Sequence, residues 1–360
     1  MIVIDGDSHV EESLAMFSLI EKEFHSRRPL AVKLEDDTAY GKNNAVWLID
    51  GETYPKLVGK RGTIFRTPTL MDSAKLKHES IGAQEMTDIE TRVKDMDRMG
   101  VSTQVVFPTL FLTTTAEDLK LEAALLRAYN SFMAARCAAS NGRIRFAALV
   151  PIRDVNESIN ELRRAANLGA TGVMLLGVAW DKPLGDESLF PFYEEAGNLN
   201  LPVCIHLGWG CPALRDVFDA STNFYSAILP VLMGVHSLLT SGVMESVPKF
   251  RLGIFEAGSE WLPFLLRQAG KENIRSGRGS KEPAEYFRQG RVFVGCEAEE
   301  DISYVAKLIG EDALVVGSDY PHGDPFRQED MVGELKQRAD ISARLVEKIL
   351  SDNPRRLYGL

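Results

Sequence analysis

Four apolar segments, far apart along the chain, are each followed by side chains that can bind a metal ion. The segments cover residues 2–4, 203–205, 252–255 and 313–316, and each has the composition of a buried strand. They are followed by Asp7 and His9, by His206, by Glu256, and by Asp319 and His322. A single such residue is usually a cap or a turn residue, but repeated placement after strands predicts a metal site at one rim of a parallel barrel.

The elements between these segments support that arrangement. We expect eight strands, at about 2–6, 103–107, 144–150, 172–176, 202–206, 251–256, 291–297 and 313–316. Helical periodicity is expected from residue 88 to the stop at Gly100, and at about 116–139, 154–167, 188–198, 222–246, 259–275, 299–309 and 341–350. Strands that alternate with helices eight times predict an α/β (β/α)8 barrel in a single domain of residues 1–360.

An open doubly wound sheet is the second fold that alternation allows. That fold normally carries a glycine-rich phosphate-binding turn after its first strand. Here the corresponding turn is Asp5-Gly6-Asp7-Ser8-His9, whose carboxylates would repel a phosphate. The barrel is therefore the preferred prediction.

Residues 14–86 interrupt the regular alternation and read as an insertion after the first strand. Within them, Asp50-Gly51 separates two β-prone stretches, which predicts a tight hairpin turn. We expect the insertion to form a lid or a subunit interface.

Composition excludes several classes of protein. The chain has 41 Lys+Arg against 51 Asp+Glu, a net charge of −10, which argues against a nucleic-acid partner. No run of 18 apolar residues predicts a membrane span, and no signal-peptide pattern is present, so we expect a cytoplasmic protein. The four cysteines form no CxxC pair, which is typical of reduced thiols.

Several motifs together resemble the amidohydrolase-related branch of the amidohydrolase superfamily, which includes enzymes similar to aminocarboxymuconate-semialdehyde decarboxylase. They are Asp7-x-His9, His206, the stretch 255–263, Ser318-Asp319-Tyr320-Pro321-His322 and Asn353-Pro354-Arg355-Arg356-Leu357-Tyr358. The resemblance implies a distorted barrel with a divalent metal held by Asp7, His9, His206 and Asp319. It also implies a homodimer.

Imidazole and carboxylate ligands suit zinc, manganese or iron, and the absence of thiolates argues against a closed structural site. An open coordination position would activate a water molecule or polarise a chelating substrate oxygen. We therefore expect a metal-dependent hydrolase or non-oxidative decarboxylase, acting on a small carboxylated or aromatic molecule, with Asp319 also shuttling protons.

Glu256 departs from the resemblance. Decarboxylases of this branch carry a histidine at the end of strand six, whereas this chain has Glu256 in Phe-Glu-Ala-Gly. A glutamate can still act as general acid or base, and His236 on the preceding helix is an alternative proton carrier. A carboxylate that merely caps the helix at 259–275 is the structural alternative for Glu256.

The sequence has more potential ligands than one metal ion needs, so a second ion is possible. Glu12, His236, Glu256 and His322 add to the four-residue set, and a dinuclear iron or manganese–iron oxygenase is the alternative enzyme class. The competing interpretation is that Glu12 caps a helix and His322 orients Asp319. A non-catalytic barrel subunit is a third possibility, against which the retained ligand set argues. Weaker candidates for substrate binding are Arg61, Arg66 and Trp209.

Overall fold

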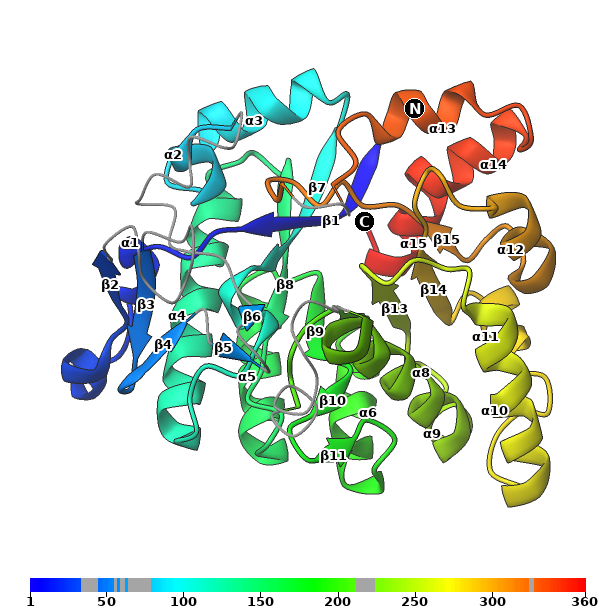
Figure 1. Cartoon of the computed structure of the whole chain (residues 1–360), viewed down its shortest axis with the longest axis horizontal. Helices are drawn as coiled ribbons and strands as arrows, with labels where there is room; N and C mark the ends of the chain where they lie inside the picture. Colours follow the sequence, from blue (N-terminus) through cyan, green and yellow to red (C-terminus); the bar gives the residue numbers. More distant parts are fainter. Residues whose placement is uncertain (34–44, 55–56, 59–61, 64–78, 212–223, 324–326) are drawn as a thin grey trace.

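An eight-stranded parallel sheet forms the centre of the protein (Figure 1). The computed structural model describes residues 1–33, 45–54, 57–58, 62–63, 79–211, 224–323 and 327–360. The strands run in the order β1-β7-β8-β9-β12-β13-β14-β15, so every neighbour in the sheet is the next barrel strand along the chain. Their bounds are Ile4–Val10, Thr103–Pro108, Ile144–Leu149, Gly172–Leu176, Val203–His206, Leu252–Phe255, Val292–Gly295 and Leu314–Val315.

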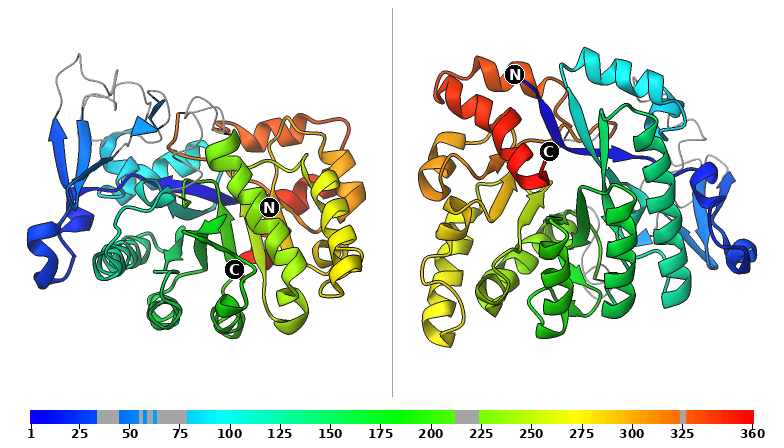
Figure 2. Two further views of the ribbon diagram at one scale, coloured as in Figure 1. Left: turned by 60° about the horizontal axis from the view of Figure 1, so that its bottom comes forward. Right: turned by 180° about the vertical axis from the view of Figure 1, so that it is seen from behind.

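The last strand returns to the first and nearly closes the barrel. The Gly6 N–H donates to the carbonyl of Val316 at 2.9 Å, and the Asp319 N–H donates to the carbonyl of Asp7 at 3.0 Å. Helices surround the strands on the outside in all three views (Figures 1 and 2). The predicted (β/α)8 barrel is confirmed, and the ends of its strands meet at one rim.

The helices follow the expected alternation, with ends set by local caps. The Asp88 and Asp154 carboxylates accept the Thr91 and Glu157 amides, which starts two helices where the sequence predicts. The helices around the barrel are α3 Ile89–Arg98, α4 Leu119–Ala138, α5 Val155–Asn167, α6 Phe190–Asn198, α8 Leu229–Ser241, α9 Val243–Ser246, α10 Leu262–Ser276, α11 Ala284–Arg288, α12 Ile302–Ile309, α13 Met331–Gln337, α14 Ala343–Glu347 and α15 Asn353–Tyr358.

Two of the expected helices are more divided than the periodicity indicates. The stretch 222–246 contains the short π-helix η5 Phe224–Ile228 before α8, and Gly242, with φ of 90°, separates α8 from α9. The C-terminal stretch joins α14 to α15 through a second short π-helix, η6 Lys348–Asp352. Shorter single-turn elements are η3 Leu110–Leu112, η4 Glu187–Leu189 and the hairpin β10 Val178–Ala179 with β11 Lys182–Pro183.

The insertion builds a small antiparallel sheet beside the barrel, at the edge of both views in Figure 2. Asp50 and Gly51 have φ of 52° and 85° and connect β3 to β4, so the predicted hairpin is confirmed. The described elements are α1 Leu14–Phe17, η1 Lys22–Arg27, β2 Leu30–Lys33, β3 Ala45–Ile49, β4 Glu52–Tyr54, β5 Leu57–Val58, β6 Gly62–Thr63 and α2 Ile81–Gln84. Its role as a lid or interface stays a prediction.

Aromatic side chains fill the barrel beneath the carboxyl rim. Phe107 and Phe255, both buried, lie with ring centroids 5.4 Å apart, and Phe107 lies 5.2 Å from the ring of His206. These packed rings form a rigid apolar layer directly beneath the polar side chains of the rim. Within the described residues, no helix has the length and apolar composition needed to cross a bilayer.

Candidate metal centre

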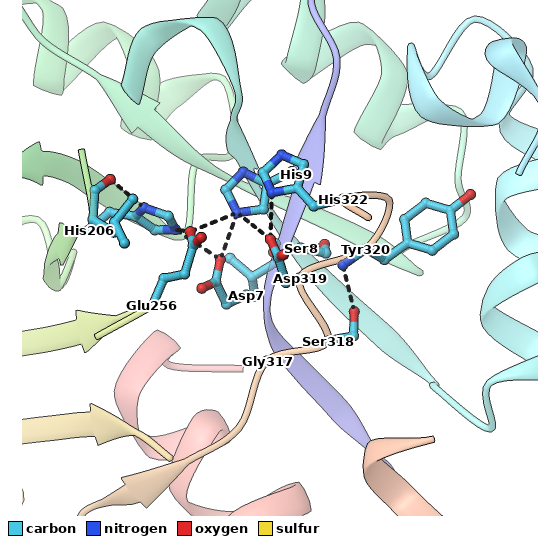
Figure 3. A network of polar contacts seen from close by, with 12 residues as sticks. Asp7, Ser8, His9, His206, Glu256, Gly317, Ser318, Asp319, Tyr320 and His322 are labelled. Atoms are coloured by element: carbon cyan, nitrogen blue, oxygen red, sulfur yellow. Dashed lines mark hydrogen bonds and ion pairs between the residues drawn. The ribbon is translucent and has the colours of Figure 1, made fainter. Parts of the chain in front are cut away.

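Six side chains from four segments point toward one another at the rim of the barrel (Figure 3). They are Asp7 and His9 of β1, His206 of β12, Glu256 after β13, and Asp319 and His322 after β15. Two overlapping groups have ligand atoms that all lie within 4.8 Å of one another: Asp7, His9, His206 and Glu256, and His9, Glu256, Asp319 and His322. The predicted convergence of distant strand ends is thus present in the structure.

The spacing of these atoms is that of ligands around one ion. His206 Nε2 lies 3.3 Å from Asp7 Oδ1 and 3.4 Å from Glu256 Oε2. His9 Nε2 lies 3.4 Å from Asp319 Oδ1 and 3.5 Å from Asp7 Oδ1. Metal bonds of about 2.0–2.2 Å in a tetrahedral arrangement place neighbouring ligand atoms about 3.3–3.6 Å apart. The donor set therefore fits a divalent cation.

Backbone carbonyls set the tautomer of both central histidines. His9 Nδ1 lies 2.8 Å from the carbonyl of Pro108, and His206 Nδ1 lies 3.0 Å from the carbonyl of Leu207. A carbonyl only accepts hydrogen bonds, so each Nδ1 carries a proton and each Nε2 faces the centre, where a metal ion would take the place of its proton. The two overlapping groups share His9 and Glu256, so their ligand atoms form one connected cluster.

The electrostatics of the centre favour positive charge. Burial by itself would lower the pKa of His206, but the carboxylates of Asp7 and Glu256 outweigh it and raise the pKa to about 9. The side chains of His206, Asp7 and Glu256 are at most 6% exposed, so this field is little screened by solvent.

Two of the carboxylates are held by strained backbone. Glu256 has φ of 52° and Asp319 has φ of 54°, a left-handed conformation that residues other than glycine rarely adopt. Glu256 directly follows β13, whereas Asp319 lies four residues beyond the end of β15, and both side chains point toward the cluster (Figure 3). Such strain clusters at functional sites, because the surrounding structure must compensate for it.

The resemblance-derived ligands Asp7, His9, His206 and Asp319 all lie in the cluster, and Glu256 and His322 join them. His322 Nδ1 lies 2.6 Å from Asp319 Oδ1, its Nε2 lies 2.9 Å from Thr109 Oγ1, and its ring stacks on His9 with centroids 4.0 Å apart. His322 thus contacts Asp319 directly, as expected for an orienting residue. Which of the six bind the ion stays a prediction.

Glu256 does not cap the following helix through the amides that a cap would use. The Ser259 amide donates to Glu300 Oε1 at 2.6 Å, and the Glu260 amide donates to the same oxygen at 3.3 Å. Glu300, which the sequence reasoning missed, therefore organises this turn. The Glu256 carboxylate instead lies 3.4–3.7 Å from the two central histidines.

Two sequence candidates lie away from the cluster. The Glu12 carboxylate accepts the amides of Thr109 at 3.0 Å and Leu110 at 2.7 Å, at the start of the turn after β7. His236 lies on the outer helix α8, where Glu272 of α10 interacts with it electrostatically. The structure does not bring His236 into the cluster, and its role as a proton carrier stays a prediction. Glu12 serves as a backbone anchor rather than as a member of the cluster.

The structure does not place any of the three predicted substrate-binding residues at the cluster. Arg61 and Arg66 lie outside the described residues. Trp209 is 9% exposed and packs in the hydrophobic core, and its backbone pairs with Leu112 and Thr113. A small cavity of about 30 Å³ lies beside the cluster, lined by Asp7, Glu256 and Asp319 together with Phe255, Gly258, Gly295, Cys296, Glu297, Gly317 and Gln328. This space is large enough for a water molecule beside the carboxylates.

Glu12 gives a pH-dependent test of its anchoring role. Burial raises its pKa to about 8, so the folded protein retains a proton that the unfolded chain releases near pH 4.5. Stability should therefore fall as pH rises from about 4.5 to about 8, by at most about 1.4 kcal/mol per pH unit. Glu12→Gln should flatten this decline and leave the metal content unchanged, as measured by thermal unfolding at several pH values. Loss of metal from Glu12→Gln would instead place Glu12 at the centre.

Comparison with characterised proteins agrees with the geometry. The chain is 26% identical over 293 residues to 2-amino-3-carboxymuconate-6-semialdehyde decarboxylase of Dictyostelium discoideum, covering 76% of this chain and 77% of the relative. It is 24% identical over 328 residues to gamma-resorcylate decarboxylase of Rhizobium radiobacter, covering 81% and 94%.

Solved structures share the fold. An amidohydrolase from Mycobacterium avium subsp. paratuberculosis K-10 superposes with a TM-score of 0.78 at 22% identity, over 100% of this chain and 98% of that one. A dihydroxybenzoic acid decarboxylase from Polaromonas sp. JS666, solved with manganese and 2-nitroresorcinol, superposes with a TM-score of 0.65 at 20% identity, over 81% and 93%.

A family model described as amidohydrolase matches residues 81–360, which include every strand of the barrel except the first. The chain therefore belongs to the amidohydrolase family and is an enzyme of the amidohydrolase superfamily.

Proposed function

We propose that this enzyme is a non-oxidative decarboxylase of small aromatic carboxylates that uses one divalent metal ion, with manganese as the first candidate. The observation that carries the proposal is the convergence of three carboxylates and three imidazoles on one buried point at the barrel rim. Support comes from the two relatives, both named as decarboxylases, and from the manganese in a structure of the same fold.

A bound divalent ion would act as a Lewis acid that polarises a chelating oxygen of the substrate. Asp7, His9 and His206 would hold it, since Asp7 Oδ1 and the two Nε2 atoms share one point of the rim.

Asp319 would supply the proton that replaces the carboxylate. Its carboxylic acid form would donate a proton to the ring carbon that bears the carboxylate, after which the carbon–carbon bond breaks, its electron pair returns to the ring and CO₂ leaves. His322 Nδ1, 2.6 Å from Asp319 Oδ1, is positioned to return a proton to Asp319. Atoms and charge balance without an oxidant.

Hydrolysis is the second candidate, and Glu256 is the observation that favours it. A buried glutamate 3.4 Å from His206 can act as general base toward a water molecule. The dinuclear oxygenase has less support, because Glu12 and His236, two of the surplus ligands that suggested it, lie away from the cluster.

A substrate panel tests the proposal. Manganese-loaded enzyme is incubated with 2,6-dihydroxybenzoate and related hydroxybenzoates, and in parallel with aryl amides, esters and lactones. Metal-dependent release of CO₂ with formation of the corresponding phenol supports decarboxylation. Turnover confined to the amides, esters or lactones would overturn it in favour of a hydrolase.

Glu256→Gln separates the possible roles of this residue. The amide cannot carry a proton, so if Glu256 acts as an acid or base, turnover should fall about a hundredfold or more while metal content and melting temperature stay near those of the parent. Glu299→Gln, at an exposed position in the next loop, is the matched control and should be fully active. Reduced metal content would make Glu256 a ligand, and unchanged turnover would remove it from the chemistry.

A further inference from the structure

We propose that Arg92, on helix α3, is a positioning residue that holds the two ligand-bearing segments of the metal centre against each other. One segment is β1, with Asp7 and His9, and the other is residues 318–322, with Asp319 and His322. The inference rests on the metal centre proposed above, but its test can fail on its own.

Arg92 is fully buried and reaches β1 directly. Its Nη1 donates to the carbonyl of His9 at 2.8 Å, and its Nη2 donates to the hydroxyl of Ser8 at 3.4 Å. Nε donates to Gln104 Oε1 of β7 at 2.9 Å. A buried guanidinium is costly unless its donors are satisfied, and here its donors contact the strand that bears two of the ligands and the neighbouring strand.

The contact continues from Gln104 to the second segment. Gln104 Nε2 donates to Asp5 Oδ2 at 3.0 Å. The same carboxylate accepts the Ser318 amide at 2.8 Å and the Ser318 hydroxyl at 2.6 Å, next to Asp319. The chain Arg92–Gln104–Asp5–Ser318 therefore joins α3, β7, β1 and the segment after β15 through side chains alone.

Tyr320 provides a second connection between α3 and that segment. Its side chain points away from the cluster (Figure 3), and its hydroxyl donates to Asp95 Oδ2 at 2.7 Å. The guanidinium of Arg92 lies 4.3 Å from the centroid of its ring, within the range of a cation–π contact. Asp319 is thus flanked by two residues, Ser318 and Tyr320, that are both tied to α3 or its partners.

The fold explains why side chains, rather than strand pairing alone, must hold β1 and residues 318–322 together. Strand β15 has only two residues, so its ladder ends before Asp319. On β1 the register shifts between Asp5 and Ser8, where three steps along β1 match two along β7, from Gln104 to Val106. Such a bulge reverses the alternation, so Asp5 faces Gln104 while Asp7 faces the centre. Arg92 contacts β1 and Asp5 contacts Ser318, so these two side chains connect β1 to the segment after β15 where the barrel closes.

The test compares Arg92→Met with Asn130→Leu. Asn130, on α4, is equally buried; its side-chain amide donates to the carbonyl of Leu149 on β8 and accepts from the Leu149 N–H. Because β8 bears none of the candidate ligands, Asn130 is a matched control for the loss of a buried helix-to-strand contact. We measure the Kd for Mn²⁺, the visible spectrum with Co²⁺ and the melting temperature. Arg92→Met should bind Mn²⁺ about 10–100-fold more weakly and change the Co²⁺ spectrum. Asn130→Leu should lose melting temperature with both metal readouts unchanged.

Arg92→Lys keeps the charge without the forked geometry and carries the test if the methionine variant does not fold. It should weaken Mn²⁺ binding in the same direction with a smaller loss of melting temperature. Variants at Arg92 that fold and bind Mn²⁺ with parental affinity and an unchanged Co²⁺ spectrum would overturn the inference. Absence of metal binding by the parent protein would instead contradict the proposed function.

Discussion

Replacement of Asp319 with asparagine is expected to reduce turnover by about 10²–10⁴-fold, the range attributed to a positioned general acid. Asp319 has φ of 54°, and asparagine adopts this left-handed conformation readily, so the variant should keep the backbone of the turn. The loss would then report on the carboxylate alone. The measurement is kcat with saturating Mn²⁺ and the substrate identified by the panel, beside the metal content of the variant.

Asp312→Asn is the matched control for this variant. Asp312 precedes β15 and contacts Lys348 and Arg356 at the surface, so its replacement should leave kcat unchanged. Asp319→Asn with full metal and parental kcat would exclude Asp319 as the proton donor. If the variant loses its metal as well, Asp319 is a ligand, and the proton must come from another group.

His206→Ala is expected to weaken metal binding by more than about a hundredfold and to abolish metal-dependent activity. The imidazole presents Nε2 within 3.3–3.4 Å of Asp7 and Glu256, and loss of a direct ligand should exceed the 10–100-fold effect of an outer-shell partner. Without it, the remaining carboxylates repel one another. Metal content after dialysis and the Kd for Mn²⁺ provide the readout, and added imidazole should restore part of the binding.

His236→Ala separates the loss of an imidazole from the loss of a ligand. His236 lies on α8 outside the barrel, so this variant should keep both its metal and its activity. A His206→Ala variant that retains parental metal content would show that His206 is not a ligand. Loss of metal from His236→Ala would contradict the placement of the centre.

Strand periodicity predicted the barrel well because buried parallel strands are short, apolar and followed by turns. All eight expected strands are present, with ends displaced by a few residues. The largest difference is at β1, expected at 2–6 and observed as Ile4–Val10. Asp7 and His9 therefore lie within the strand rather than after it. Polar residues inside a buried strand break the apolar pattern, so periodicity ends the strand too early.

The candidate centre could be predicted from residue type and position after strands, whereas the choice among surplus ligands could not. Glu12 and His322 both follow a ligand by three residues, but Glu12 turns toward the amides of Thr109 and Leu110 while His322 contacts Asp319. The bulge in β1 and the turn after Asp319 decide these directions, and neither leaves a clear signal in one sequence.

Arg92 was the missed residue with a readable signal. It lies between Ile89 and Met96, on the face of the helix whose apolar residues recur at helical spacing, and it is completely buried. A charged residue on an apolar face requires buried partners. Those partners, Gln104 and Ser8, belong to strands whose relative placement only the folded chain provides.

The most direct test of the proposed metal-dependent decarboxylation is a metal titration of chelator-treated protein. CO₂ release from an aromatic carboxylate is measured at each ratio of Mn²⁺ to chain. We predict no CO₂ release without metal, a linear rise on addition of Mn²⁺ and saturation at about one ion per chain, since the two overlapping ligand groups share His9 and Glu256. Decarboxylation that persists in metal-free protein, or activity that requires two ions per chain, would contradict the single metal centre.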